Sequence, residues 1–356
     1  MLQRASVLAL AALVTLSAAH AAPARADRVY VQQPGQTAPK KATFWERVQS
    51  PHLDEIRHLV AEAVFLRQNV ATQYWDQYLL PARRQVLRDA LARYEQALAL
   101  DAHRSDLRLD AAHTALEAGE YEHAVTHYLA YREGSNDNSL LVTYNLAEAY
   151  ARLRHFDEAI DELEPIADDP ANYERARFLT LLGQAYMAKG RLDDAIDALE
   201  RALAAYPQQQ YGSADQLALA LLAVAYDRDE QLGRAHEMLD QLRAIDPQFY
   251  VFMQQQPVTA VQAPSQRTYL IYSPPAERHY FLGLFYEAQG RYADAMASWR
   301  AYLDSAEPAF ARRAQQHLTG SYKALEDSAH QRQAAARNAA ARPVPARGRT
   351  PVGAKP

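Results

Sequence analysis

The chain has no cysteine among its 356 residues. This absence excludes disulfide bonds, metal sites held by thiolates, a cysteine nucleophile and a lipid-modified N-terminal cysteine. Several catalytic motifs are missing as well: there is no glycine-rich phosphate loop after a strand pattern, no nucleophile elbow and no metalloprotease motif. We therefore expect neither enzyme activity nor a cofactor.

An apolar run long enough to cross a bilayer is also lacking. The run at Val7–Leu16 is well short of the roughly 20 residues that a spanning helix needs. Arg4 precedes the run, and small residues behind it offer two cleavage sites, after Ala21 or after Ala26. This layout is typical of a secretory signal peptide. We predict that residues 1–26 are a signal peptide and that the protein is exported, to the periplasm or out of the cell.

Acidic residues are absent from the C-terminal segment 331–356. Its cations are Arg332, Arg337, Arg342, Arg347, Arg349 and Lys355. With these six and the signal-peptide residues Arg4 and Arg25 set apart, 30 of the 38 basic residues remain against 43 acidic ones. Such an acidic body would repel phosphates, so a specific nucleic-acid partner is not expected. The basic tail is either a solvated end or a contact with an anionic membrane surface or cell-wall polymer.

One pattern occurs four times with nearly constant spacing. Each copy has a small residue, a tyrosine three positions later, and then a second small residue, two further apolar or aromatic residues and a proline. The copies are Ala147, Tyr150, Ala159, Leu163, Ile166, Pro170; Gly183, Tyr186, Ala195, Leu199, Ala202, Pro207; Ala223, Tyr226, Ala235, Leu239, Leu242, Pro247; and Gly283, Tyr286, Ala295, Trp299, Tyr302, Pro308. Small residues at matched offsets let two consecutive helices approach closely.

A bend separates the two halves of each copy. Glycine occupies this bend at positions 119, 190 and 290, where a left-handed backbone would end the first helix at least cost. Arg154 and Glu230 hold the same place in two other copies. We expect these two bends to be strained.

This pattern resembles the tetratricopeptide repeat, a helix-turn-helix unit of 34 residues that stacks into a solenoid. The resemblance implies an all-α fold, a right-handed superhelical solenoid with helical caps. Clear units start near residues 140, 176, 216 and 276, and two degenerate units precede them at about 71–104 and 105–138. In the first degenerate unit, Pro81 stands where the tyrosine is usual.

The remaining segments are assigned from their composition. The predicted order is signal peptide 1–26, flexible leader 27–50, capping helix 51–70, repeats 71–249, insertion loop 250–275, final repeat 276–309, capping helix 310–328 and disordered basic tail 329–356. The insertion contains two apolar, aromatic runs that favour strand over helix. It is either an ordered loop on the solenoid or a flap that lies in the groove or pairs with a strand of a partner.

In this family the first helix of each repeat lines a concave groove, and ligands usually bind there. Carried over by repeat position, the lining residues are Leu141, Tyr144, Asn145, Glu148, Arg177, Thr180, Gln184, Leu217, Ala220, Val224, Glu277, Tyr280 and Leu284. The resemblance implies a protein-binding scaffold, within a cell-envelope assembly, that holds an extended or helical peptide segment. Asn145 and Arg177 match two positions of a carboxylate clamp found in some members, but the other clamp positions are not kept.

His123 and His127 lie one helical turn apart, with Glu122 adjacent and His113 on the partner helix. An i, i+4 spacing can place two imidazoles on one metal ion. Both, however, flank the small and aromatic core positions of this repeat on its outward face, where solvated histidines are ordinary. We therefore predict no metal site.

Overall fold

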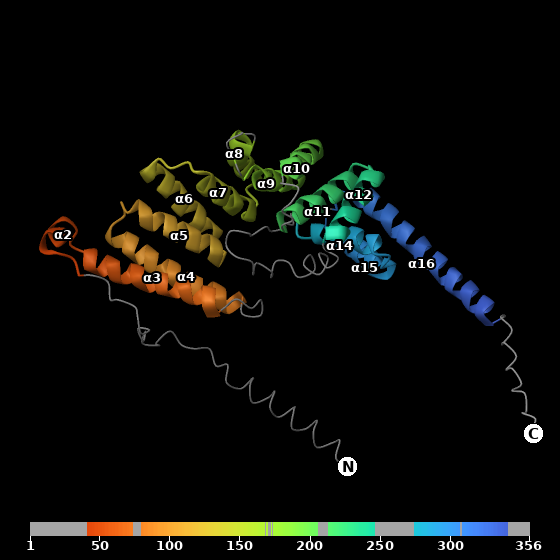
Figure 1. Ribbon diagram of the computed structural model, residues 1–356, viewed down its shortest axis with the longest axis horizontal. Coiled ribbons are helices and arrows are strands. Elements are labelled where there is room, and N and C mark those ends of the chain that lie inside the picture. Colours follow the sequence, from red (N-terminus) through yellow and green to blue (C-terminus); the bar gives the residue numbers. More distant parts are fainter. Residues whose placement is uncertain are drawn as a thin grey trace, which may run out of the picture. The chain divides into compact units, whose positions relative to one another are not determined.

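The computed structural model describes residues 41–73, 80–167, 169, 172, 174–205, 213–245, 274–306 and 308–340. Over these residues the protein is all-α, with fourteen helices and no strand (Figure 1). The chain forms two compact units, residues 1–54 and 55–356. The segment predicted to be a signal peptide, the predicted insertion up to residue 273 and the predicted tail beyond residue 340 lie outside the described residues.

The first unit contains a short helix, α2 (Phe44–Gln49). The Thr43 hydroxyl accepts a hydrogen bond from the Glu46 backbone amide at 3.3 Å, and the Thr43 amide donates to Glu46 Oε2 at 2.6 Å. This capping box satisfies two amides that a helix start leaves free. The prediction of a flexible leader over 27–50 is therefore wrong for residues 44–49.

The second unit is a row of antiparallel helices, and from Leu80–Leu100 onward each described helix packs on the next described one along the chain. Beginning with the helix that crosses into this unit, the elements are α3 (Leu53–Gln73), α4 (Leu80–Leu100), α5 (Ser105–Ala118), α6 (Tyr121–Ser135), α7 (Leu140–Arg152), α8 (Phe156–Ala167), α9 (Arg175–Ala188), α10 (Leu192–Ala205), α11 (Ser213–Arg228), α12 (Leu232–Ile245), α14 (Glu277–Ala288), α15 (Tyr292–Leu303) and α16 (Ala311–Ala340). In addition, α5 contacts α7, α7 contacts α9, and α9 contacts α11. The first helices of successive hairpins therefore form one continuous row.

The bends between paired helices have the backbone that the sequence predicted. Gly119, Gly190 and Gly290 have φ angles of 83°, 73° and 69°. Arg154 and Glu230 adopt the same left-handed conformation, with φ angles of 67° and 59°. A side chain in this conformation costs roughly 1–2 kcal/mol, so the expected strain at these two bends is confirmed.

Close helix approach explains the small residues of the repeat. A Cβ atom added to Gly183 would lie 2.6 Å from Leu199 Cγ, and one added to Gly283 would lie 2.5 Å from Trp299 Cε2. Both distances are far below van der Waals contact. The large side chain of the second helix thus occupies the space that the glycine leaves on the first helix.

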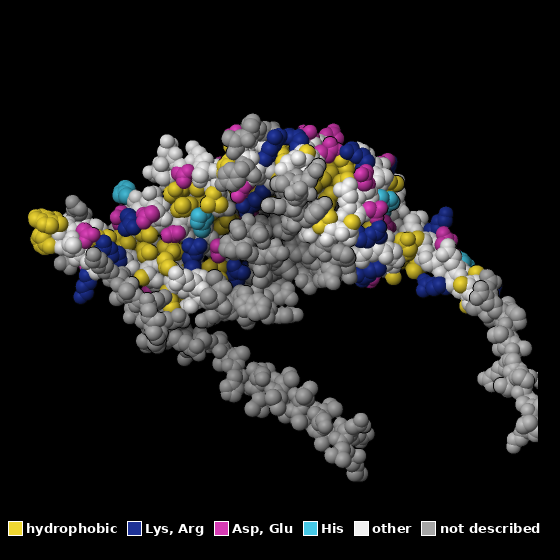
Figure 2. Space-filling model, viewed as in Figure 1, with side chains coloured by type: hydrophobic (Ala, Val, Ile, Leu, Met, Phe, Trp, Pro, Cys, Tyr) yellow, Lys and Arg dark blue, Asp and Glu magenta, His cyan; other side chains and the backbone are white. Residues whose placement is uncertain are grey.

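In two of the repeats, the tyrosine of the first helix bonds to the preceding hairpin. Tyr186 on α9 donates to Glu164 on α8 at 2.5 Å, and Arg191 lies 4.3 Å above the tyrosine ring. Tyr226 on α11 makes the equivalent bond to Glu200 on α10, and the Arg234 guanidinium stacks 4.0 Å above its ring. On the face drawn in Figure 2, Lys and Arg side chains lie close to Asp and Glu side chains in several places.

The N-terminal repeat differs from the prediction. The expected helix-turn-helix at 71–104 does not form, because residues 80–100 make one uninterrupted helix, α4, with Pro81 in its first turn. Proline is well tolerated there, since the first amides of a helix have no intrahelical acceptor. Helix α3 packs on α4 through a shared apolar cluster and a Glu62–Arg93 ion pair of 2.7 Å. The partner of α4 is thus the helix that was expected to be a cap.

The C-terminal helix is longer than predicted. Helix α16 continues to Ala340, so the expectation of disorder from residue 329 is wrong for residues 329–340. Between Ala329 and Ala340 the chain has no proline or glycine and is rich in alanine, the best helix former. None of the described helices combines the length and apolar character needed to cross a membrane.

Candidate functional site

A hollow lies among the first helices α9, α11 and α14. It encloses about 290 Å³, part of which is open to solvent. Its lining mixes polar and apolar groups: Gln184, Met187 and Ala188 from α9, Leu221 and Arg228 from α11, and Glu277 and Phe281 from α14. Met187 and Ala188 are partly exposed, whereas the other lining residues are buried. The site therefore presents a partly exposed apolar rim over a buried floor of polar and apolar groups.

The floor contains a buried ion pair. The Arg228 guanidinium bonds to Glu277, and their side chains are 4% and 9% exposed. Aromatic rings of Tyr280 and Phe310 lie 4.5 and 4.4 Å from the same guanidinium. Glu277 also accepts a hydrogen bond from Tyr302 at 3.1 Å. Among the described residues no acceptor pairs with Arg228 Nε, so one buried donor remains unused.

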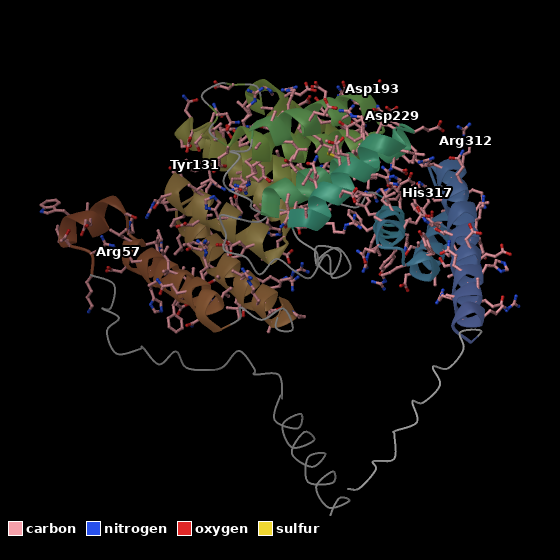
Figure 3. The ribbon with its side chains drawn as sticks, turned by 45° about the vertical axis from the view of Figure 1, so that its right-hand side comes forward. Arg57, Tyr131, Asp193, Asp229, Arg312 and His317 are labelled. Atoms are coloured by element: carbon pink, nitrogen blue, oxygen red, sulfur yellow. The ribbon has the colours of Figure 1, made fainter. Side chains whose placement is uncertain are left out.

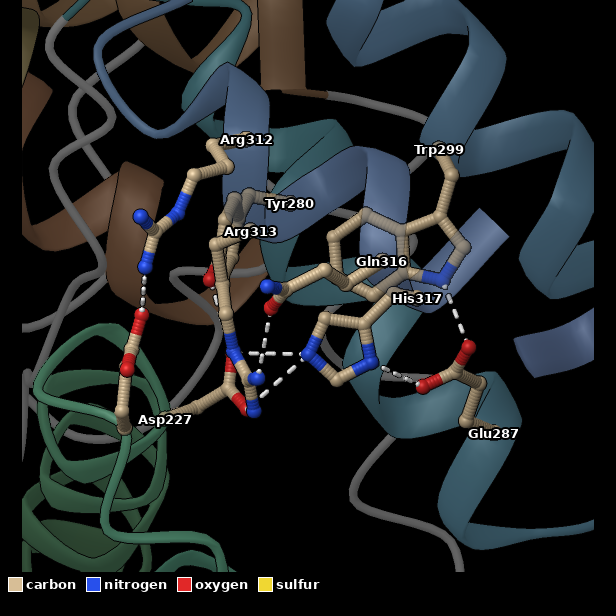
Figure 4. Close-up of polar contacts among 9 residues, drawn as sticks. Asp227, Tyr280, Glu287, Trp299, Arg312, Arg313, Gln316 and His317 are labelled. Carbon is tan, nitrogen blue, oxygen red and sulfur yellow. Dashed lines mark hydrogen bonds and ion pairs between the residues drawn. The ribbon is translucent and has the colours of Figure 1, made fainter. Parts of the chain in front are cut away.

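A second buried network lies behind this pair and ties α16 to α11 and α14. Asp227, which is fully buried, accepts from Tyr280 Oη at 2.7 Å and from Arg313 at 2.6 Å (Figure 4). His317 lies on the side of α16 that faces the preceding helices (Figure 3). Its Nε2 is 2.9 Å from Asp227, and its Nδ1 is 2.6 Å from Glu287.

The network fixes the charges of its members. Burial lowers the pKa of His317, but the hydrogen bonds to Asp227 and Glu287 outweigh burial and raise that pKa to about 9. Burial likewise opposes the charge of Asp227, yet the hydrogen bonds from His317 and Arg313 hold its pKa at about 2. The imidazolium also stacks on Trp299, with ring centroids 4.7 Å apart. Because both ring nitrogens are bonded to carboxylates, His317 has no free nitrogen for proton transfer.

The predicted groove residues are mostly inside the helix packing. All of them are buried except Leu141, which is 50% exposed, and Arg177, whose side chain is 19% exposed. The Arg177 guanidinium lies 3.8 Å above the Tyr144 ring and pairs with Glu174 at 3.4 Å. Glu148 pairs with Arg152 at 3.5 Å.

Two of the predicted residues, Gln184 and Glu277, lie in the hollow. Asn145 and Arg177, the two clamp positions, lie on the neighbouring helices α7 and α9, and Asn145 is buried. Sequence reasoning missed Asp227, His317 and Arg228. They carry no motif, and Asp227 and His317 meet only because helices 90 residues apart in sequence pack together. Of the predicted tail cations, Arg332 and Arg337 are exposed on α16, and the other four lie beyond the described residues.

The second unit thus defines a class of protein: helical hairpins stacked in a row, with a mixed hollow on their first helices. The family model described as Tetratricopeptide repeat matches residues 144–210, which hold most of α7 and all of α8, α9 and α10. The protein contains tetratricopeptide repeats, as the resemblance of its pattern predicted. No protein of curated function matches the sequence.

Several solved structures are similar to this chain. PilW, a type IV pilus biogenesis factor, is 19% identical, covers 67% of this chain and 96% of its own, and has a TM-score of 0.41. YrrB, a tetratricopeptide repeat protein with an unusual peptide-binding site, is 18% identical over 54% of this chain and 97% of its own, with a TM-score of 0.39. MamA is 18% identical over 61% of this chain and 95% of its own, with a TM-score of 0.34. At these scores the functions of those proteins do not transfer to this chain.

Proposed function

We propose that the protein is an exported scaffold, without enzyme activity, that binds a segment of another protein on the row of first helices. The observation that carries this proposal is the hollow shared by α9, α11 and α14, which no single repeat builds alone. The tetratricopeptide repeat match at residues 144–210 supports it, because such repeats create extended binding surfaces.

The size and lining of the hollow favour one anchoring side chain. The hollow is a shallow depression: its volume of about 290 Å³ includes space open to solvent and is still below the roughly 300–1,000 Å³ of small-molecule pockets. Met187, Leu221 and Phe281 supply apolar contact for the anchor. Gln184 places a side-chain amide in the same lining. A protein segment with an apolar or aromatic side chain is the partner that we propose.

Export would place this partner in the cell envelope or outside the cell. The support is the signal-peptide pattern of residues 1–26. We therefore propose that the scaffold belongs to a cell-envelope assembly.

The test is affinity capture from the envelope fraction of the source cell, using the full chain and two variants. Met187→Lys places a charge on the rim of the hollow, and Met238→Lys is its control. Both methionines are partly buried beside the same apolar cluster, but Met238 lies on the second helix α12. We expect Met187→Lys to lose the captured protein and Met238→Lys to retain it, at equal helix content by circular dichroism. Equal capture by both variants would contradict the proposal.

A second candidate function is attachment through the basic C-terminal segment. Arg332 and Arg337 are exposed on α16, past the last buried residue of that helix, Ser321. Cations at a surface bind anionic lipid or polymer, and salt weakens such binding. A chain truncated after Ala329 should lose its binding to anionic vesicles if the segment is the contact. Binding that survives both truncation and high salt would exclude this candidate.

A further inference from the structure

Three side chains from two helices converge on the outer side of the N-terminal hairpins. His123 and His127 project from α6, and Glu95 projects from α4. The carboxylate Oε1 of Glu95 is 2.6 Å from His123 Nδ1 and 3.4 Å from His127 Nε2. These three ligand atoms all lie within 4.8 Å of one another. His113 is not part of the group, because its ring packs edge-on against Tyr128.

We propose that Glu95, His123 and His127 bind one divalent transition-metal ion, with zinc as the preferred ion, and that the ion joins α4 to α6. Neighbouring ligands of a tetrahedral zinc ion lie about 3.4 Å apart when the metal–ligand bonds are near 2.1 Å. The separation of Glu95 from His127 already has this value. The hydrogen bond of Glu95 to His123 must lengthen by about 1 Å to admit the ion. The His123 side chain is 53% exposed, so a small rotation of this side chain can provide the extra separation.

The chemistry of the three groups selects the ion. Two imidazoles and one carboxylate suit zinc and similar transition metals, whereas magnesium and calcium prefer oxygen ligands alone. Burial lowers the pKa of His127, and the Glu95 hydrogen bond opposes this effect only in part. Burial thus favours the neutral imidazole, which is the form that binds a metal. The partly exposed Glu95 and His123 leave a fourth position open to water.

The surroundings of His127 set a limit on the affinity. Its Nδ1 is buried, and among the described residues no group accepts a hydrogen bond from it. Histidine ligands usually donate this second N–H to a carboxylate or carbonyl, and loss of such a partner weakens binding 10–100-fold. We expect the site to bind zinc more weakly than the closed four-ligand sites of structural zinc domains.

The chain offers a matched control for an ordinary histidine–carboxylate contact. His58 Nε2 lies 3.1 Å from Glu62 on α3, one turn apart, in a pair that lacks a second histidine. Removing His58 changes the number of histidines in the same way as removing His123, but it leaves the three-residue group intact.

The experiment is zinc titration by calorimetry on the full chain, without a histidine tag and after chelator treatment. We expect one zinc ion per chain, binding at least tenfold weaker in His123→Ala and Glu95→Gln, and unchanged binding in His58→Ala. Cobalt in place of zinc should give the visible spectrum of a tetrahedral or five-coordinate ion only where the three ligands are present. Zinc should also raise the melting temperature of the wild type and of His58→Ala, but not that of His123→Ala or Glu95→Gln.

Two results would overturn the proposal. One is that the wild type binds zinc no more tightly than Glu95→Gln does. The other is an equal loss of binding in His58→Ala and His123→Ala, which would indicate scattered surface histidines. Circular dichroism of each variant separates loss of binding from loss of folding.

Discussion

His317 is a single residue whose charge is coupled to folding. Its pKa is about 9 in the folded protein, against 6.5 for a free imidazole. The raised value means that the native state holds the proton more tightly than the unfolded chain does. The stability that His317 contributes is therefore complete below about pH 6.5 and is lost as the pH rises through about 9. Asp227 acts in the opposite range, since its pKa of about 2 makes its contribution vanish only in strong acid.

This coupling predicts a pH dependence of stability. The free energy of unfolding should fall by up to about 3 kcal/mol between pH 6.5 and pH 9, and His317→Gln should remove most of that slope. Urea denaturation at pH 6.5 and pH 9 measures this fall in the free energy of unfolding. His236→Gln, at an exposed position on α12, is the control and should keep the wild-type slope. An unchanged slope in His317→Gln would show that another group is responsible.

Within single hairpins, packing depends on glycine where the opposing side chain is large and held in place. Trp299 stacks on His317 and donates to Glu287 at 3.0 Å, so it has no room to retreat from a Cβ atom at position 283. Leu199, opposite Gly183, has a flexible side chain and fewer constraints. The same repeat position is thus more sensitive in the last hairpin than in the α9–α10 hairpin.

Gly283→Ala should therefore lower the free energy of unfolding by about 2–3 kcal/mol, the cost of overpacking a rigid core. Gly320→Ala is the matched control, because Gly320 lies within α16 and faces open space. There the substitution should stabilise the helix by up to about 1 kcal/mol. Thermal unfolding of both variants tests the pair. A loss in Gly283→Ala no larger than that in Gly183→Ala would contradict the role given to Trp299.

For the whole row of hairpins, stability is a sum of the repeats and their interfaces. The described contact between α12 and α14 is slight compared with those inside hairpins. Asp227, Arg313 and His317 instead connect the end of the row, α16, directly to α11. We expect this buried network to make the last hairpin and α16 unfold together with the α11–α12 hairpin.

Asp227→Ala should break this coupling. Removing one partner from a buried charged network costs about 3–5 kcal/mol, because the remaining charges are left uncompensated. Hydrogen exchange should then show α14, α15 and α16 opening before α5–α10, whereas the wild type protects them together. Asp229→Ala, at an exposed position two residues away, should leave the exchange pattern unchanged. Uniform protection in Asp227→Ala would mean that apolar packing alone couples the repeats.

Local sequence determined the repeats of this protein. Small residues at fixed offsets, tyrosine at the end of first helices and the left-handed bends at Gly119, Arg154 and Glu230 act within a few residues of one another. Their spacing therefore predicted the hairpins from α5 onward. It failed at the ends, where α4 runs uninterrupted from Leu80 and α16 continues to Ala340, because no repeat pattern marks those boundaries.

Only the tertiary structure decided the sites. Glu95 meets His123 and His127 across about 30 residues, and Asp227 meets His317 across 90 residues. The hollow needs three first helices at once. Each of these contacts depends on how far a helix is rotated about its axis. From one residue to the next along a helix, the direction of the side chain changes by about 100°. A shift of one position redirects every side chain, so sequence spacing alone identifies the helices but not which of their polar groups meet.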